Sequence, residues 1–497
     1  MKILEKVKKI MASISYSTEE KALWGRRRDA IWALCDAIYS RVDHLTTAEM
    51  PRKATIQQLL NRLKQFGGTQ FKFFDEGFST SSKIELLPRQ NQTEGFSVSY
   101  TFGTLIDQIS NDLVTIQRAQ EQRMSSTAAA TLTIADRIAY HALLQVSHLL
   151  EQPSTVLTYF HKSPDTRVVP YAPVALVGIP ATCYFLHLDP SGTGVLRDLL
   201  AIPHELGHHL YWNGSKDTIQ NQLRFLPLEQ LSNLPDWLRF WLEEIFADSV
   251  SCIIGGPIAA LSFQDLQSQA RNDWLLRDDG VYPVPALRPF IYSEILKQMG
   301  MQSAADKLAQ RWQKVLENRG LITSIEPAQE HLTFTPFSGE GPILFRLALE
   351  QIAAVVGAIL PIFEDVNPAE RWSSDIGEDV DLTNEEDVEG LYAQFAQQVI
   401  HPFLTPEQPV IDFDPQWPER KWYDWVRNRG VQYDNLQSFV VLNRVSIAQD
   451  PLITILQNWE EGQLDDLIKL PPENWELILE FAGWSTEGPT DGNLSGG

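Results

Sequence analysis

Residues 201–212 read AIPHELGHHLYW. The fold that we expect for the surrounding chain follows from this stretch. The pattern predicts a helix that carries His204 and His208 on one face, because residues four apart in a helix are neighbours. Two imidazoles on one face can bind a single metal ion. Glu205 then lies beside the ion, in the position of a general base for a metal-bound water. The stretch therefore predicts the first half of a metal site.

The second half requires a third protein ligand, since a catalytic zinc site has three protein ligands and one open position. Residues 241–251 read WLEEIFADSVS and predict a helix with a polar stripe, Glu244 and Asp248, on an otherwise apolar surface. Buried carboxylates must be paired or bind metal. We predict that Glu244 binds the ion and that Asp248 accepts the free N–H of a ligand histidine. The reverse assignment, with Asp248 as the ligand, is the alternative.

Two further residues of this predicted helix, Ala247 and Glu243, bear on the site. Ala247 lies between them and is small enough to let another helix approach closely. Glu243 lies about 100° around the helix from Glu244 and ranks below it as a ligand. The predicted ligands are therefore His204, His208 and Glu244, and Zn²⁺ is the ion that such nitrogen and oxygen donors suit.

The two motifs carry a family resemblance. His204-Glu205-x-x-His208 followed by Glu244-x-x-Ala247-Asp248 resembles the HExxH and ExxAD arrangement of gluzincin metallopeptidases. The most similar pattern is that of the prenyl-protein endopeptidases and their bacterial heat-shock relatives. The resemblance covers residues 170–300 and implies a zincin-like core, in which two helices hold Zn²⁺ and the edge strand of a small sheet binds the substrate backbone.

The resemblance also places a strand and a loop. Residues 174–179 are the strand expected upstream of the first motif, and prolines on both sides favour an edge strand over a central one. Residues 277–288 resemble the loop that carries a His-Pro pair in these enzymes, with Tyr282 where the histidine would be. The Tyr282 phenol can donate to an oxyanion, and Arg288 can bind an oxyanion or a substrate carboxylate. The competing interpretation is a proline-rich loop with a packed tyrosine and a surface arginine.

The predicted function is hydrolysis of peptide bonds by a zinc-activated water, with Glu205 as the general base. Two alternatives stay open. One is a zincin fold that keeps its metal or its shape without turnover and acts as a scaffold or interaction protein. The other is a helix whose histidines only pack. A protein or peptide substrate is the expected partner; no feature of the sequence indicates an oligomeric state.

Composition narrows the class of protein further. The 497 residues carry 64 acidic and 41 basic side chains, a formal charge of -23, which argues against nucleic acid as a partner. Three cysteines (Cys35, Cys183 and Cys252) lie in apolar contexts without a CxxC pair and are expected to be buried free thiols. The longest apolar run, residues 352–363, is too short to cross a bilayer. We therefore expect a cytoplasmic protein without a signal peptide or membrane span.

The expected fold class is α+β and mostly helical. Amphipathic patterns predict an N-terminal helical region over residues 1–155. A zincin-like core with a small sheet is expected over residues 156–325, and a second helical region over residues 326–484. Residues 485–497 are rich in glycine and serine, which predicts a disordered tail.

Overall fold

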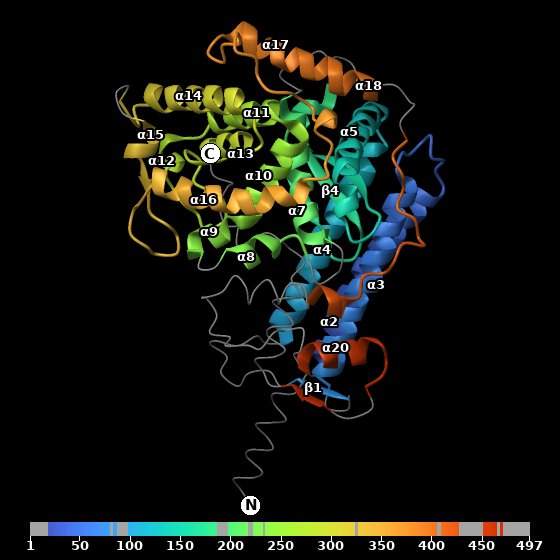
Figure 1. Cartoon of the computed structure of the whole chain (residues 1–497). Helices are drawn as coiled ribbons and strands as arrows, with labels where there is room; N and C mark the ends of the chain where they lie inside the picture. Colours follow the sequence, from blue (N-terminus) through green and yellow to red (C-terminus); the bar gives the residue numbers. More distant parts are fainter. Residues whose placement is uncertain are drawn as a thin grey trace, which may run out of the picture. The chain divides into compact units, whose positions relative to one another are not determined.

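The structure, a computed structural model, describes residues 18–79, 83–86, 98–185, 197–216, 222–231, 234–323, 327–404, 409–426, 451–464 and 468–470. The predicted tail at residues 485–497 lies outside these ranges. The described chain is mostly helical with small sheets, as the predicted fold class requires (Figure 1). Cys35, Cys183 and Cys252 are buried and unbridged, which confirms that part of the prediction.

The chain divides into two compact units. The first comprises residues 1–121, 169–172 and 413–497, and the second comprises residues 122–168 and 173–412. The boundaries expected after residues 155 and 325 are not the boundaries of these units. Helix α5 (Ser126–Val146) packs on strand β2 (Thr155–His161), and α16 (Phe345–Ile359) packs on α10 (Leu242–Gly255). Segments on both sides of the expected boundaries therefore share the core of the second unit.

The first unit is built on long helices with an aromatic core. Phe73 makes edge contacts with Trp422 and Trp459, with ring centroids 5.1 Å apart in both cases. Its only described strands, β1 (Ile84–Leu86) and β7 (Ile468–Leu470), pair in parallel. Its described helices are α2 (Thr18–Asp43), α3 (Lys53–Gly77), most of α4 (Val98–Arg123) and α20 (Pro451–Glu460).

The second unit places helices against a three-stranded sheet. The strand order is β2-β4-β3, with β4 (Val174–Pro180) parallel to β2 and antiparallel to β3 (Asp165–Val168). The prediction that residues 174–179 form an edge strand was therefore wrong: β4 is central and β3 is at the edge. Pro173 precedes β4 and Pro180 is its last residue, so neither proline interrupts the hydrogen-bonded ladder within the strand.

The remaining elements of the second unit cover the sheet and one another. A two-residue hairpin pair, β5 (Thr333–Phe334) and β6 (Ile343–Leu344), is antiparallel. The longer helices besides those already named are α7 (Ile202–Asn213), α11 (Pro257–Gln267), α13 (Arg288–Gln298), α14 (Gln302–Asn318) and α17 (Glu385–Phe395). The shorter ones are α8 (Leu226–Gln230), α9 (Asp236–Phe240), α12 (Asn272–Leu275), α15 (Ala328–His331) and α18 (His401–Phe403), with single turns η1 (Ser147–Leu149), η2 (Ala181–Phe185), η3 (Leu360–Phe363), η4 (Pro368–Glu370) and η5 (Ala396–Ile400).

Helices α7 and α10 cross at very short range, and Figure 1 shows them side by side. A Cβ atom placed on Gly207 would lie 2.6 Å from the Cα atom of Ala247, which is closer than any real side chain tolerates. Only glycine on one helix, facing alanine on the other, allows this approach. The predicted role of Ala247 is thereby confirmed. The crossing brings the side chains that flank Gly207 directly against those that flank Ala247.

One helical stretch, Phe345–Phe363, is long and apolar enough to span a membrane by length and composition. Its most apolar window is 44% buried inside the protein, and α16 packs on α10 and α13. A core helix of a water-soluble protein meets the same criterion. This stretch therefore carries no argument for a membrane span by itself.

Candidate metal centre

The crossing of α7 and α10 brings His204, His208 and Glu244 together, with their ligand atoms all within 4.8 Å of one another. The two histidine Nε2 atoms are 3.2 Å apart. Glu244 Oε2 lies 3.5 Å from Nε2 of His204, and Glu244 Oε1 lies 3.6 Å from Nε2 of His208. A tetrahedral zinc ion with bonds of about 2.0–2.1 Å has edges of about 3.3–3.4 Å between its ligand atoms. These three residues can therefore hold one metal ion and leave one vertex open.

The Nδ1 atom of each histidine, the ring nitrogen that does not face the cluster, lies next to a carboxylate. His204 Nδ1 lies 3.0 Å from Asp248 Oδ1, and His208 Nδ1 lies 2.9 Å from Glu243 Oε1. The Trp212 indole N–H donates to the same Glu243 oxygen at 2.9 Å. Such carboxylates fix the ring orientation and direct Nε2 toward a metal. Asp248 lies beside Nδ1 of His204, and Glu244 rather than Asp248 belongs to the three residues that could hold a metal ion.

The place of Glu243 was not predicted. Its position on the helix ranks Glu243 below Glu244 as a ligand. The structure places Glu243 Oε1 2.9 Å from Nδ1 of His208. Trp212, four residues after His208, was the available signal, since an indole N–H on the same face needs an acceptor. The metal centre therefore has two supporting carboxylates, one on each histidine.

We predict that Glu243→Ala weakens zinc binding by about 10–100-fold, because His208 loses the acceptor that orients its ring. Competition against a fluorescent zinc chelator measures the affinity. Glu350→Ala is the matched control, since the Glu350 side chain is 59% exposed on α16 and pairs only with Arg346 there. Unchanged affinity in Glu243→Ala would show that the ring of His208 is held by its packing alone.

Arg288 is part of the centre rather than of the protein surface. Only 6% of the residue is exposed. Its Nε donates to Asp248 Oδ2 at 2.8 Å, and its Nη2 donates to Asp248 Oδ1 at 2.7 Å and to Glu244 Oε2 at 2.6 Å. The surface-arginine interpretation is excluded by this burial. Because the guanidinium is already shared by two carboxylates, Arg288 positions Glu244 and Asp248 rather than meeting a substrate group.

The charges of the metal-free centre follow from these contacts. Burial raises the pKa of the Glu244 carboxyl, but the charges of Arg288, His208 and His204 together outweigh burial and hold that pKa well below its usual range. Burial disfavours protonation of His204, but its contacts with Asp248 and then Glu244 outweigh burial and raise its pKa to about 10. Burial raises the pKa of Glu205 to about 7. The ion-binding carboxylate is thus ionised, and a proton acceptor of moderate strength lies next to the ligands.

Tyr282 lies on the loop between α12 and α13. It is 41% exposed, and its backbone N–H donates to Asp279 Oδ1 at 2.9 Å, which fixes the turn that presents it. Burial raises the pKa of its phenol above the usual range, and the charges of Glu244, Arg288 and Glu205 also act on it. The hydroxyl is therefore neutral, as a hydrogen-bond donor to an oxyanion must be.

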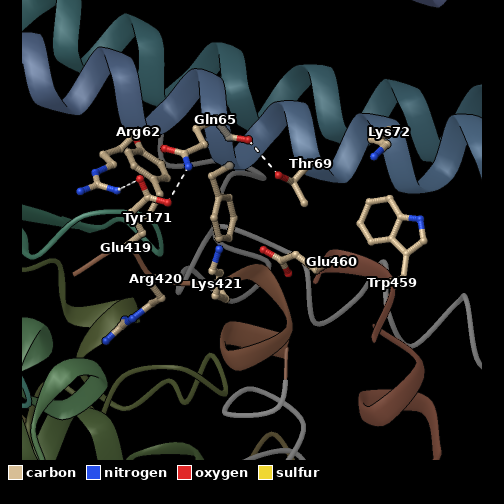
Figure 2. A pocket seen from close by; sticks show the side chains of 11 residues that line it. Arg62, Gln65, Thr69, Lys72, Tyr171, Glu419, Arg420, Lys421, Trp459 and Glu460 are labelled. Atoms are coloured by element: carbon tan, nitrogen blue, oxygen red, sulfur yellow. Dashed lines mark hydrogen bonds and ion pairs between the residues drawn. The ribbon is translucent and has the colours of Figure 1, made fainter. Parts of the chain in front are cut away.

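The first unit holds a separate cavity of about 150 Å³ between α3, the segment near residue 420 and the end of α20 (Figure 2). Its charged groups are largely engaged with one another. Arg62 pairs with Glu419 at 2.7 Å, and Lys72 lies 5.4 Å from the ring centroid of Trp459. None of the 11 lining residues is a histidine or cysteine, so this cavity does not repeat the histidine and carboxylate donor set of the candidate metal centre. The metal centre is the stronger candidate.

Comparison with known proteins adds no relative: no protein family, no curated protein and no solved structure matches this chain. The resemblance to gluzincins therefore depends on the two motifs and on the distances that α7 and α10 create between them.

Proposed function

We propose that this protein is a zinc-dependent peptidase. One observation carries the proposal: His204, His208 and Glu244 each offer a ligand atom within 4.8 Å of the others, with the two histidine Nε2 atoms 3.2 Å apart and each within 3.6 Å of one oxygen of Glu244. A structural zinc site would use a fourth protein ligand, and among the described residues this cluster contains three. The open vertex and the neighbouring Glu205 favour catalysis.

The chain supplies the groups that peptide hydrolysis needs. A bound Zn²⁺ provides an acidified water and polarises the scissile carbonyl. Glu205 takes the proton from the attacking water and delivers it to the leaving amine. The Tyr282 hydroxyl donates to the oxygen that becomes negative in the tetrahedral intermediate. Asp248 and Glu243 keep the two histidine rings in the orientation that this chemistry requires.

The sheet offers a place for the substrate backbone. β3 is one of its two outer strands and packs against α7, and the charge of Asp165 on β3 acts on Glu205. An extended peptide that adds to an exposed edge gains backbone hydrogen bonds without a demand on its sequence. We place the substrate along β3, in the role that the sequence assigned to residues 174–179.

Metal content and hydrolysis together test the proposal. We expect the purified full chain to contain about one zinc ion, and His204→Ala to contain less than a tenth of that amount. Hydrolysis of a quenched fluorescent peptide library should stop with a chelator and return with zinc. His148→Ala is the matched control, because His148 is exposed and belongs to the same unit. A wild-type protein that binds no metal would refute the proposal, and a zinc-loaded protein without hydrolysis would favour an inert scaffold.

A further inference from the structure

The cavity of the first unit is basic, although the chain as a whole is strongly acidic. The whole chain carries 64 acidic and 41 basic residues. The cavity is lined by four basic and two acidic side chains: Arg62, Lys72, Arg420 and Lys421 against Glu419 and Glu460. A hollow whose local charge is positive raises the concentration of small anions there. The charge balance therefore points to an anionic ligand.

Both acidic side chains of the wall are already engaged by donors. Glu419 Oε1 pairs with Arg62 at 2.7 Å, and Glu419 Oε2 accepts the Gln65 amide at 2.6 Å. The two oxygens of Glu460 accept the backbone N–H groups of residues 422 and 423 at 3.2 and 3.1 Å. Hydrogen bonds of this kind offset the charge of a carboxylate. The two acids therefore oppose an anion in the cavity less than free carboxylates would.

The two lysines of the wall are not committed in the same way. Lys72 Nζ lies 3.9 Å from Glu76 Oε1, at the outer limit of an ion pair, and the other oxygen of Glu76 accepts the Trp459 indole N–H at 2.7 Å. The Lys72 side chain is 68% exposed, and exposed pairs contribute little. Within the described part of the chain, no carboxylate pairs with Lys421. Both ammonium groups can therefore meet a ligand.

The wall of the cavity is also aromatic. Phe66, Tyr171 and Trp459 line it, and all three are buried. Lys72 Nζ lies 5.4 Å from the Trp459 ring centroid, so a cation and an apolar surface are neighbours there. The volume of about 150 Å³ equals that of an engineered protein cavity that binds benzene. The cavity can therefore cover a body of about one ring.

The lining groups reach the cavity from two sides. Figure 2 shows Gln65, Thr69 and Lys72 on α3 at one side, and Lys421 and Glu460 at the other. The Thr69 hydroxyl donates to the Gln65 carbonyl at 3.1 Å within the helix. Positive charge therefore faces the cavity from both sides, and Thr69 on α3 marks a position where a larger side chain would fill it.

We propose that this cavity binds a small organic anion, a carboxylate or a phosphate ester with a body of about one ring. The lysines hold the anionic group, and the aromatic wall covers the body and removes it from water. The lining residues all belong to the first unit, whereas His204, His208 and Glu244 belong to the second. The inference is therefore independent of the proposed peptidase function.

Isothermal titration calorimetry on the full chain tests the ligand class with four probes: benzoate, phenyl phosphate, inorganic phosphate and benzamide, the neutral analogue of benzoate. We expect benzoate or phenyl phosphate to bind with a Kd of about 1 mM or tighter. That anion should bind about 10-fold more tightly than benzamide, the usual effect of hydrogen bonds to a charged group. Inorganic phosphate should bind about 10-fold more weakly than the better anion, because it has no apolar body.

Variants locate the site. Lys72→Gln combined with Lys421→Gln should weaken binding of the better anion by about 10-fold or more. Thr69→Met, which adds bulk on the cavity side of α3, should abolish binding. Lys21→Gln is the matched control, because Lys21 is 54% exposed on α2 of the same unit and does not line the cavity. His204→Ala should bind as the wild type does, since the anion does not occupy the metal centre.

Each contrary result overturns the assignment. Equal affinity for benzamide and benzoate would show that the cavity does not select charge, and unchanged affinity in the double lysine variant would show that the lysines do not hold it. Binding that survives Thr69→Met, or is lost in His204→Ala, would place the anion elsewhere. Absence of binding by all four probes would refute the site. None of these measurements uses hydrolysis, so the peptidase proposal is tested separately.

Discussion

Glu205→Gln is expected to lower kcat by about 10²–10⁴-fold, the usual contribution of a general base, while zinc content stays at the wild-type level. Glu205 is next to a ligand but contributes no atom to the ligand cluster of His204, His208 and Glu244. It is 7% exposed, and glutamine keeps its size and its packing. The substitution therefore removes only the ability to carry a proton. Stopped assays on the peptide library and metal analysis of the same sample measure both quantities.

Two variants make this result interpretable. His204→Ala should lose both metal and hydrolysis, which separates loss of a ligand from loss of a base. Glu350→Gln, the same chemical change at an exposed position on α16, should behave as wild type. Hydrolysis at the wild-type rate in Glu205→Gln would mean that another group accepts the proton, and the mechanism proposed for this centre would be wrong.

The two side-chain pairs of the candidate site could be predicted from the sequence because each pair depends on the geometry of a single helix. His204 and His208 are four residues apart, and so are Glu244 and Asp248, so each pair lies on one face of its helix whatever surrounds it. The partner of His208 depends instead on the angle and depth at which α7 crosses α10. Gly207 and Ala247 set that depth, and their contact is visible only in three dimensions. The lower rank of Glu243 as a ligand agrees with the cluster, but its contact with Nδ1 of His208 was not predicted.

The contact of Arg288 with the carboxylates could not be predicted, because a long segment separates it from them in the sequence. Arg288 lies 40 residues beyond Asp248 in the sequence, and nothing in the intervening composition specifies that its guanidinium returns to that carboxylate. The sheet was misjudged for a different reason. Residues 174–179 form a continuous apolar run and are all buried, a pattern typical of a central strand, but the flanking prolines received more weight. A proline at the end of a strand or just before it does not exclude a central strand, because it removes no hydrogen bond from the interior of the ladder.

Arg288→Met is expected to destabilise the metal-free protein by about 3–5 kcal/mol, the range found when one partner of a buried ion pair is removed. Burial raises the pKa of the Asp248 carboxyl, and the charges and hydrogen bonds of Arg288 and His204 together outweigh burial and lower it. Without the guanidinium, Asp248 and Glu244 remain buried beside each other, with the His204 imidazolium as the cation that still contacts both. A bound zinc ion would supply part of the missing charge, so zinc should stabilise the variant more than it stabilises the wild type.

Arg123→Met provides the matched comparison. Arg123 donates to both oxygens of Asp136 at 2.9 and 2.8 Å, and both side chains are buried in the second unit, away from the ligand residues in sequence. Arg123→Met should also leave a buried carboxylate without its partner. The loss in free energy of unfolding should be the same with and without zinc. Urea unfolding with chelator or zinc, together with hydrogen exchange of the α7 and α10 amides, measures the difference. A loss below about 1 kcal/mol in metal-free Arg288→Met would show that the two carboxylates do not depend on this arginine, because removing a partner from a buried pair has a larger effect than that.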